Sequence, residues 1–208
     1  MVADRFMFNN GELEDYEDMY AEFDKYLAEA LVEVEKKAEP FAVEFAKKHW
    51  NDEMHYFVGA GNQWGATYSY AMCYWEEQLW LKTKSITSNE FFHGMFEIVT
   101  KETPVTIYIG EDAQRPLSER VANFIPRICE NYTIIDSKDY ELKGISEKYR
   151  KHLSHHVMHA VTTESMFIWK SNSSPYRNPS LLQKIRILKY KGWIHSTFYI
   201  LRIGGYYE

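Results

Sequence analysis

Short runs rich in β-branched and aromatic residues alternate with longer helical segments through the middle of this chain. The runs lie at 54–58, 104–110 and 132–136. Segments with helical spacing lie at 63–81, where one face is expected to enter the core with Tyr68, Met72, Trp75 and Leu79, and at 117–130, which Pro126 is expected to kink or shorten. Strands that alternate with helices build a parallel sheet with helices on both of its faces. We therefore predict an α/β fold, a three-layer αβα sandwich with a parallel sheet, whose ligands bind beyond the carboxyl ends of the strands.

Helices are predicted to precede this sheet. Apolar residues recur at spacings of three and four between 13 and 38, the pattern of a helix with one apolar stripe. They are Tyr20, Phe23, Leu27, Leu31, Val34 and Ala38. Pro40 is expected to break or restart the helix, with a second helix at 40–49, and residues 1–12 are expected to form a flexible lead. We expect these helices to serve packing or dimer contacts.

The net charge of −6 is unevenly spread along the 208 residues. Residues 1–53 carry −9, residues 54–142 carry −5 and residues 143–208 carry +8. A basic C-terminal stretch suggests nucleic-acid binding, but its lysines and arginines are scattered and form no visible nucleic-acid motif. We instead expect the oppositely charged ends to attract each other, within or between subunits, and we predict no nucleic-acid partner.

These patterns divide the chain into three predicted parts. They are an acidic helical segment at 1–50, an α/β domain at 51–165 and a divergent basic tail at 166–208. In the tail, residues 185–190 alternate apolar and basic side chains, which fits an edge strand as well as a helix.

Neither a membrane span nor a secretion signal is visible in the sequence. No run of eighteen apolar residues occurs, and the first residues lack an apolar signal region. Cys73 and Cys129 are the only cysteines, which favours a reducing compartment and leaves one disulfide open. We expect a cytoplasmic protein without membrane contact.

A glycine-rich turn joins the first predicted strand to the next helix. Gly59, Gly61 and Gly65 lie at this junction, where free backbone N–H groups could bind an anion. The dinucleotide fingerprint requires glycine at position 64, which is Trp64 here. We therefore predict no nicotinamide binding.

Four histidines share the helical segment 146–169. His152, His155, His156 and His159 stand at i, i+3, i+4 and i+7, and histidines four residues apart can share a metal ion. No third ligand of matching spacing accompanies them, and their apolar neighbours fit an ordinary packed helix. We predict no metal site, and we leave open that His155 enters the pocket of a neighbouring subunit.

Glu77 and His93 are the candidate catalytic pair. They stand sixteen residues apart, separated by an aromatic helix end and a short apolar–polar run at 84–87. A path of helix, strand and glycine-terminated turn can return to its start, so the carboxylate could meet the imidazole. Together these groups could move protons on a carbonyl compound, because burial can tune both pKa values toward neutrality. Glu76 and Glu77 lie about 100° apart around a helix, so they cannot share a face.

Three stretches resemble the sugar isomerase (SIS) family. They are GAGNQWGA at 59–66, CYWEEQLW at 73–80 and NEFFHGMFEIV at 89–99. The similarity runs over about residues 55–140 and is to the C-terminal SIS half of the fructoselysine- and glucoselysine-6-phosphate deglycases, relatives of the isomerase domain of glucosamine-6-phosphate synthase. Its most specific parts are the E-F-x-H-G core and the glutamate sixteen residues before that histidine. Met95 stands where the family usually has proline, a change that removes no reactive group.

The resemblance implies a function and a site. Glu77 would be the base, facing inward, and His93 the acid, while the substrate-binding residues would be Gly61, Asn62, Gln63 and Glu90. The protein would act on aminosugar or Amadori-type sugar 6-phosphates by proton transfer at C1–C2, with no metal or organic cofactor. Deglycation and aldose–ketose isomerisation use the same proton transfer, so both stay open.

Deglycases of this family carry two SIS halves, and this sequence shows one. We expect the chain to act as one half of a two-SIS enzyme, or alternatively as a non-catalytic sugar-phosphate-binding module or fragment that needs a partner chain. The apolar stripe at 20–38 and the many aromatic residues predict an oligomer, either a homo-oligomer or a pairing with a partner SIS domain. The resemblance implies that the pocket lies at a dimer interface.

Overall fold

In the computed structural model, residues 2–49 and 52–173 of the 208 are described. The chain divides into two compact units, 1–168 and 169–208. The sheet, the candidate site and, up to residue 168, the helices that cover the sheet belong to the first unit. The two boundaries between the three parts drawn from the sequence stay predictions, and the run at 185–190 lies outside the described residues.

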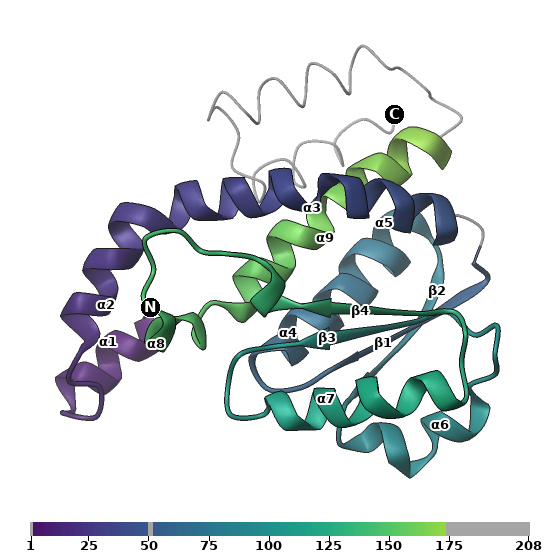
Figure 1. Cartoon of the computed structure of the whole chain (residues 1–208), viewed down its shortest axis with the longest axis horizontal. Helices are drawn as coiled ribbons and strands as arrows, with labels where there is room; N and C mark the ends of the chain where they lie inside the picture. The colour runs from purple at the N-terminus through teal and green to yellow at the C-terminus, as the bar shows by residue number, and fades with distance from the viewer. Residues whose placement is uncertain (1, 50–51, 174–208) are drawn as a thin grey trace. The chain divides into compact units, whose positions relative to one another are not determined.

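A four-stranded parallel sheet forms the centre of the first unit. Its strands are β1 (Met54–Gly59), β2 (Lys82–Thr87), β3 (Val105–Ile109) and β4 (Tyr132–Asp136), in the order β2-β1-β3-β4 (Figure 1). The predicted α/β fold with a parallel sheet is confirmed. The connection from β1 to β2 and the connection from β2 to β3 run in opposite directions along the sheet. The carboxyl ends of β1 and β3 therefore form the switch point where such sheets commonly bind ligands.

One face of the sheet packs on α6 (Met95–Ile98) and α7 (Arg115–Phe124). Alternate strand residues enter this core, so that Val58 and Ile107 meet Phe91 and Val121, all of which are fully buried. The α-helix of α7 ends at Phe124, and Ile125–Arg127 continues as a 3₁₀ turn. That shortening is the effect predicted for Pro126, which cannot donate a helical hydrogen bond.

The other face carries an aromatic core beneath α4 (Asn62–Ser69) and the π-helical stretch Tyr70–Glu76, which α5 (Glu77–Leu79) extends. The start of α9 (Ser154–Ser173) packs beside them. The rings of Phe57 and Trp75 lie 5.1 Å apart between centroids, and Tyr70 and Tyr108 complete the cluster. Cys73 and Cys129 are both free thiols, so the disulfide left open by the sequence is not formed.

The helix between β1 and β2 differs from the predicted one in its middle. Residues Tyr70–Glu76 are π-helical, and a π-helix has more residues per turn than the 3.6 on which the predicted stripe relies. Tyr68 and Met72, placed on the core face by the sequence, are therefore 46% and 39% exposed, whereas Trp75 is buried as expected.

The N-terminal helices are α1 (Val2–Asn9), α2 (Tyr16–Glu22) and α3 (Ala28–His49), with the π-helical turn Phe23–Leu27 between the last two. The predicted flexible lead is wrong, because α1 occupies most of it. The predicted break at Pro40 is also wrong, because α3 runs through it. A stripe of mostly small buried residues holds α3 to the molecule on both sides of the proline: Ala30, Val34, Ala38, Ala42, Phe45, Ala46 and His49.

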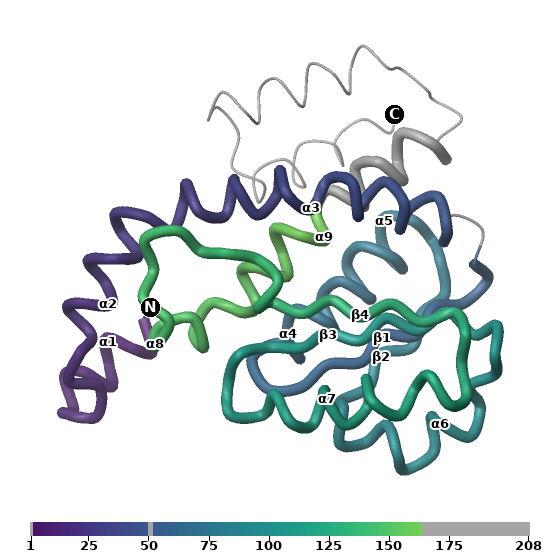
Figure 2. The backbone as a smooth tube through the Cα atoms, viewed as in Figure 1, coloured from purple at the N-terminus to yellow at the C-terminus, as the bar shows by residue number. Residues whose placement is uncertain are grey.

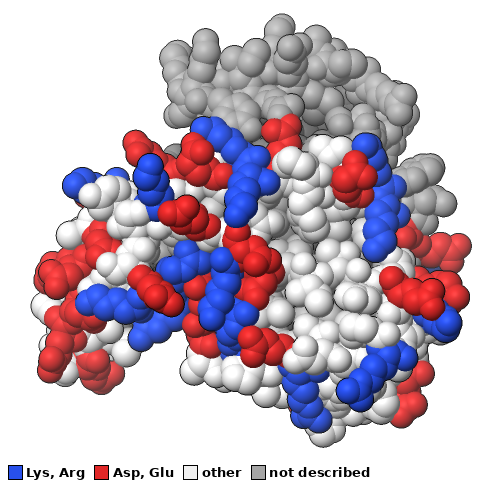
Figure 3. All heavy atoms as spheres, in the orientation of Figure 1, with Lys and Arg blue, Asp and Glu red and all other residues white. Residues whose placement is uncertain are grey.

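The short helix α8 (Glu147–Arg150) packs beside α2 (Figure 2). Ser146, just before α8, donates its backbone N–H and its hydroxyl to Glu22, at 2.7 and 2.6 Å. Acidic and basic side chains are interspersed on the face shown in Figure 3, over the part of the chain that is described. No helix within residues 2–49 and 52–173 is long and apolar enough to cross a membrane.

Candidate active site

Glu77 lies at the start of α5, close to the amino end of β2. Its side chain is exposed, and so is that of Glu76. Glu76 accepts a hydrogen bond from the hydroxyl of Thr83, the second residue of β2. Neither glutamate is buried, so in the single chain the structure does not show Glu77 as the inward-facing member of the pair.

His93 ends the 3₁₀ turn Glu90–His93, which follows the carboxyl end of β2. The turn is fixed by Phe91, which is fully buried in the core, while His93 and Glu90 remain exposed. The amide of Asn89 donates to Glu90 at 3.3 Å. The packed phenylalanine therefore presents the imidazole and the predicted binding carboxylate to solvent.

One chain does not bring Glu77 and His93 together. Glu77 belongs to the helices on the Phe57 face of the sheet, whereas His93 belongs to the turn on the Val58 face. Glu77 precedes the amino end of β2 and His93 follows its carboxyl end. The six residues of this strand span roughly 16 Å at the usual rise per residue. Among the residues that the structure describes, no hydrogen bond or ion pair joins the two side chains. The expectation that the chain path returns to its start is not met within one molecule.

The glycine turn after β1 is closed by an acid from the loop after β3. Gly61 has a φ of 57°, and a Cβ at this position would lie 2.4 Å from Asp112 Oδ1. Asp112 Oδ2 accepts the backbone N–H of Asn62 at 2.6 Å, and Asp112 Oδ1 accepts that of Gln114 at 2.7 Å. The carboxylate therefore occupies the N-terminus of α4, where the sequence indicated that an anion could bind.

The start of α9 covers the carboxyl ends of β1 and β3. Asn62 donates its side-chain amide to the carbonyl oxygen of Lys151 at 2.7 Å, and Gln63 donates to that of Ser154 at 3.0 Å. Gln63 is 1% exposed, while Gly61 and Asn62 are exposed. The contact between Gln63 and substrate stays a prediction. Because the start of α9 covers Gln63, this contact would require α9 to move.

Two arginines tie the loops of this edge together. Arg115 donates to Asp136 at 2.9 Å and to the carbonyl oxygen of Gly110 at 2.9 Å. Arg150 donates to both carboxylate oxygens of Glu111, at 2.8 and 2.7 Å. Burial, the largest single effect, would raise the pKa of Asp136, but the hydrogen bonds from Arg115 and from the Lys138 backbone, together with the charges of both residues, outweigh it and hold that pKa below 3.8.

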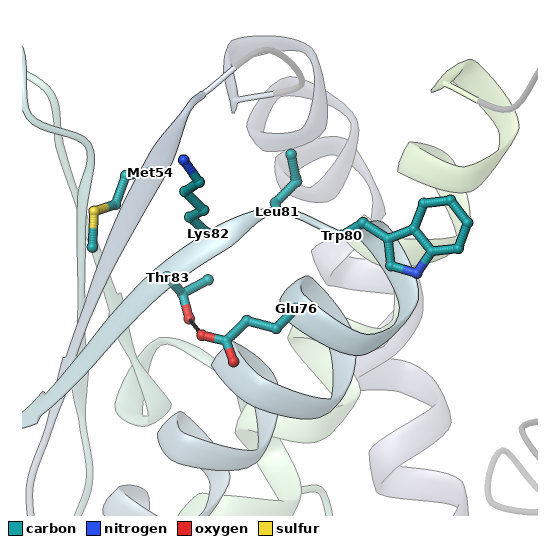
Figure 4. A pocket seen from close by; sticks show the side chains of 6 residues that line it. All are labelled: Met54, Glu76, Trp80, Leu81, Lys82 and Thr83. Atoms are coloured by element: carbon teal, nitrogen blue, oxygen red, sulfur yellow. Dashed lines mark hydrogen bonds between the residues drawn. The ribbon is translucent and has the colours of Figure 1, made fainter.

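A shallow hollow of about 470 Å³ opens at the amino ends of β1 and β2, the opposite edge from the one where ligands were expected (Figure 4). The residues lining it are Met54, Glu76, Trp80, Leu81, Lys82 and Thr83. Trp80 is 85% exposed and has a left-handed φ of 57°, a conformation that costs a non-glycine residue about 1 kcal/mol. Strained residues are common at functional sites, so the exposed Trp80, three residues after Glu77, indicates a functional surface at this edge.

The four histidines of the predicted helix lie along α9 and just before it. The rings of His155 and His156 are 3.9 Å apart between centroids, and the hydroxyl of Tyr74 lies 3.4 Å from His159 Nδ1. Burial, and then the charges of His155 and His159, lower the pKa of His156 to about 4. Burial, and then the charge of His159, also lower the pKa of His155. These imidazoles are therefore neutral at physiological pH.

A different group of histidines was missed in the sequence. His49, Asp52 and His55 converge where α3 ends and β1 begins. Burial lowers the pKa of His55 to about 4, although its hydrogen bond to Asp52 acts in the opposite direction. The even spacing of three residues was the available signal, but it crosses a helix end and a strand start, so no single periodicity reveals it.

Three known proteins show what this chain resembles. Fructosamine deglycase FrlB of Bacillus subtilis strain 168 is 32% identical over 120 residues, which are 58% of this chain and 37% of the relative. Fructoselysine 6-phosphate deglycase of Escherichia coli K12 is 34% identical over 83 residues, 40% of this chain and 24% of the relative. A crystal structure from Bacillus subtilis, assigned as a phosphosugar isomerase, superposes with a TM-score of 0.67 at 28% identity, over 70% of this chain and 44% of that one.

The chain is a relative of the SIS proteins. No family model matches the sequence, so the relationship rests on these pairwise similarities and on the shared fold. The matched region amounts to about a third of the length of the curated relative FrlB. The activities of those whole proteins are therefore not assigned to this chain by the similarity alone.

Proposed function

We propose that this chain is a phosphosugar isomerase or deglycase subunit that acts on aminosugar or Amadori-type sugar 6-phosphates. The similarity to two named deglycases carries the proposal. It is supported by Glu77 and His93, which keep the glutamate–histidine spacing of sixteen and are both exposed to solvent. No metal or organic cofactor enters the proposed chemistry.

The proposed chemistry is proton transfer on the C1–C2 unit of the open-chain sugar. The carboxylate of Glu77 would remove a proton from one carbon and return it to the neighbouring carbon. The imidazole of His93 would donate to, and accept from, the sugar oxygen as charge develops there. Positioned acid and base groups of this kind contribute about 10²–10⁴-fold to rate. Deglycation would follow if water adds to the C1 imine of the rearranged sugar, which leaves a C1 aldehyde and the free amine, and isomerisation if the amine stays on the sugar.

The active pair would be assembled from two SIS domains. One chain holds Glu77 and His93 on opposite faces of the sheet, so the glutamate of one domain would meet the histidine of another. The second domain would be a second copy of this chain or a partner SIS chain. The exposed Trp80 and the hollow beside it give the glutamate-bearing edge an apolar surface for such a contact.

Release of amine from a 6-phosphorylated fructosamine tests the activity. The chain alone and the chain mixed with a two-SIS relative's N-terminal half would be assayed for amine and for sugar-phosphate products. Glu77→Gln should lower the rate by about 10²-fold or more, whereas the adjacent Glu76→Gln should keep it within about tenfold. Equal losses in both variants, or unchanged turnover in Glu77→Gln, would remove Glu77 from the mechanism.

The second candidate function is a non-catalytic module that binds sugar phosphates or a partner chain. The separation of Glu77 from His93 and the one-third coverage of FrlB favour it. A thermal-shift titration with glucosamine 6-phosphate and fructose 6-phosphate would separate the two cases. A rise in melting temperature without product formation supports the module. Product formation supports the enzyme, and the absence of both at millimolar ligand counts against each.

A further inference from the structure

Two buried imidazoles and one carboxylate meet at the junction of α3 and β1. His49 is the last residue of α3, His55 is the second residue of β1, and Asp52 lies in the connection between them. The oxygen Asp52 Oδ2 lies 2.7 Å from His49 Nδ1 and 3.0 Å from His55 Nδ1. Each residue therefore offers one potential ligand atom, and the three atoms lie within 4.8 Å of one another.

The two imidazole rings are held in place by the aromatic core. His49 and His55 are 1% and 0% exposed, and their rings meet edge to face with centroids 4.7 Å apart. Phe45 lies 4.6 Å from the ring of His49, and Phe57 lies 4.5 Å from that of His55. Rings packed in this way cannot swing out to water, so the inward orientation of both Nδ1 atoms belongs to the fold.

The outer nitrogen of His55 already has the partner that a metal-bound histidine requires. His55 Nε2 lies 2.8 Å from Thr106 Oγ1 on the neighbouring strand β3. When Nδ1 binds a metal, Nε2 carries the proton and donates it, and such a partner fixes the tautomer and the ring. The Nε2 atom of His49 has no hydrogen-bond partner among the residues that the structure describes, so of the two rings only that of His55 has a fixed outer nitrogen.

We propose that His49 Nδ1, Asp52 Oδ2 and His55 Nδ1 bind a zinc-like divalent transition-metal ion. Two imidazoles and a carboxylate are a ligand set that Zn²⁺ accepts, with bonds of about 2.0–2.2 Å. Tetrahedral ligands at that length stand roughly 3.3 Å apart, so the present gaps of 2.7 and 3.0 Å need to open by only tenths of an ångström. Asp52, at 15% side-chain exposure, gives the ion its route from solvent.

The bound ion would clamp the N-terminal helices to the sheet. It would join the end of α3 to the first strand through three side chains instead of through one shared carboxylate oxygen. This role is independent of the proposed sugar-phosphate chemistry, because the cluster lies inside the molecule between α3 and β1 and includes neither Glu77 nor His93.

Metal titration of the full-length chain after chelator treatment tests the proposal. Zn²⁺ followed by calorimetry should bind with a stoichiometry of one at this site, and Co²⁺ should give a tetrahedral absorption spectrum. Asp52→Asn should weaken Zn²⁺ binding by roughly 100-fold, and Thr106→Val by about tenfold. The neighbouring exposed acid Glu53 supplies the matched control, because Glu53→Gln should leave binding unchanged.

The histidines of α9 could also bind the ion, so the same titration is repeated with His155→Gln/His159→Gln. The proposal is overturned if that double variant abolishes binding while Asp52→Asn does not, or if the wild-type chain binds no Zn²⁺. Should Asp52→Asn fail to fold, Asp52→Cys decides the question. A thiolate ligand restores Zn²⁺ affinity and gives Co²⁺ a sulfur charge-transfer band. If Asp52→Cys folds but shows neither Zn²⁺ affinity nor the Co²⁺ charge-transfer band, the cluster is a hydrogen-bonded network only.

Discussion

At the scale of single residues, Asp112 fills the position where the parallel sheet would otherwise receive an anion. It stands over Gly61, whose missing side chain leaves the space, and it accepts the backbone N–H groups of Asn62 and Gln114. A ligand phosphate at the N-terminus of α4 would have to displace this carboxylate. The proposed chemistry therefore depends on Glu77 and His93 and not on the glycine turn.

Replacing Asp112 with alanine should destabilise the chain by about 2 kcal/mol, because two capped N–H groups lose their acceptor. The free energy of unfolding in urea measures the change. Glu141→Ala removes an exposed loop acid and should shift stability by a few tenths of a kcal/mol only. Equal stability of the two variants would show that the cap contributes nothing.

Asp136 should make the stability of the chain depend on pH in the acid range. Its pKa is held below 3.8, mainly by Arg115, so the stabilisation is complete above about pH 4 and is lost as pH falls through the lowered pKa. Asp136→Asn should therefore cost about 2 kcal/mol at pH 7, and its deficit should shrink below pH 4. Urea unfolding of both proteins from pH 7 to pH 3 measures this. A deficit that stays constant with pH would contradict it. Glu130→Gln, at an exposed ion pair with Lys101, is the control.

At the scale of elements, local patterns predicted the sheet and failed inside two helices. The strands were found because β-branched runs and helical spacing are local signals. The predicted break at Pro40 does not occur, because the buried packing of Ala38 and Ala42 stabilises α3 on both sides of a residue that disfavours helix. The π-helical turn at Tyr70–Glu76 changes the number of residues per turn, so an apolar stripe predicted with the period of an α-helix is wrong there. Tyr68 and Met72 are therefore exposed and not in the core.

Pro40→Ala should accordingly stabilise the chain by roughly 1–3 kcal/mol, because alanine restores a backbone N–H in the helix interior and relieves the clash of the ring. Thermal and urea unfolding measure the gain. Val32→Ala, at a 40% exposed position of the same helix, should change stability little. A loss of stability in Pro40→Ala would mean that the proline stabilises α3 at this position.

At the scale of the whole molecule, the sequence could identify Glu77 and His93 but not their relation in space. Their spacing is a property of one chain, whereas a site divided between domains depends on an assembly that no run of residues encodes. The same holds for Asp112 over Gly61 and for His55 beside Thr106, contacts that join residues about fifty positions apart. Long-range contacts of this kind were the part of the site that sequence reasoning could not supply.

Mixing two inactive variants tests whether the catalytic pair is built between copies of this chain. In a two-fold dimer, Glu77→Gln and His93→Gln each damage both sites, but a mixed dimer keeps one site with its native glutamate and histidine. An equimolar mixture, after subunit exchange, should therefore recover about a quarter of wild-type activity, since about half of the dimers are mixed and each has one intact site of two. If both residues belonged to one chain's own pocket, no mixture would exceed the single variants. If the second SIS domain comes from another protein, recovery should appear only when that partner carries the missing group.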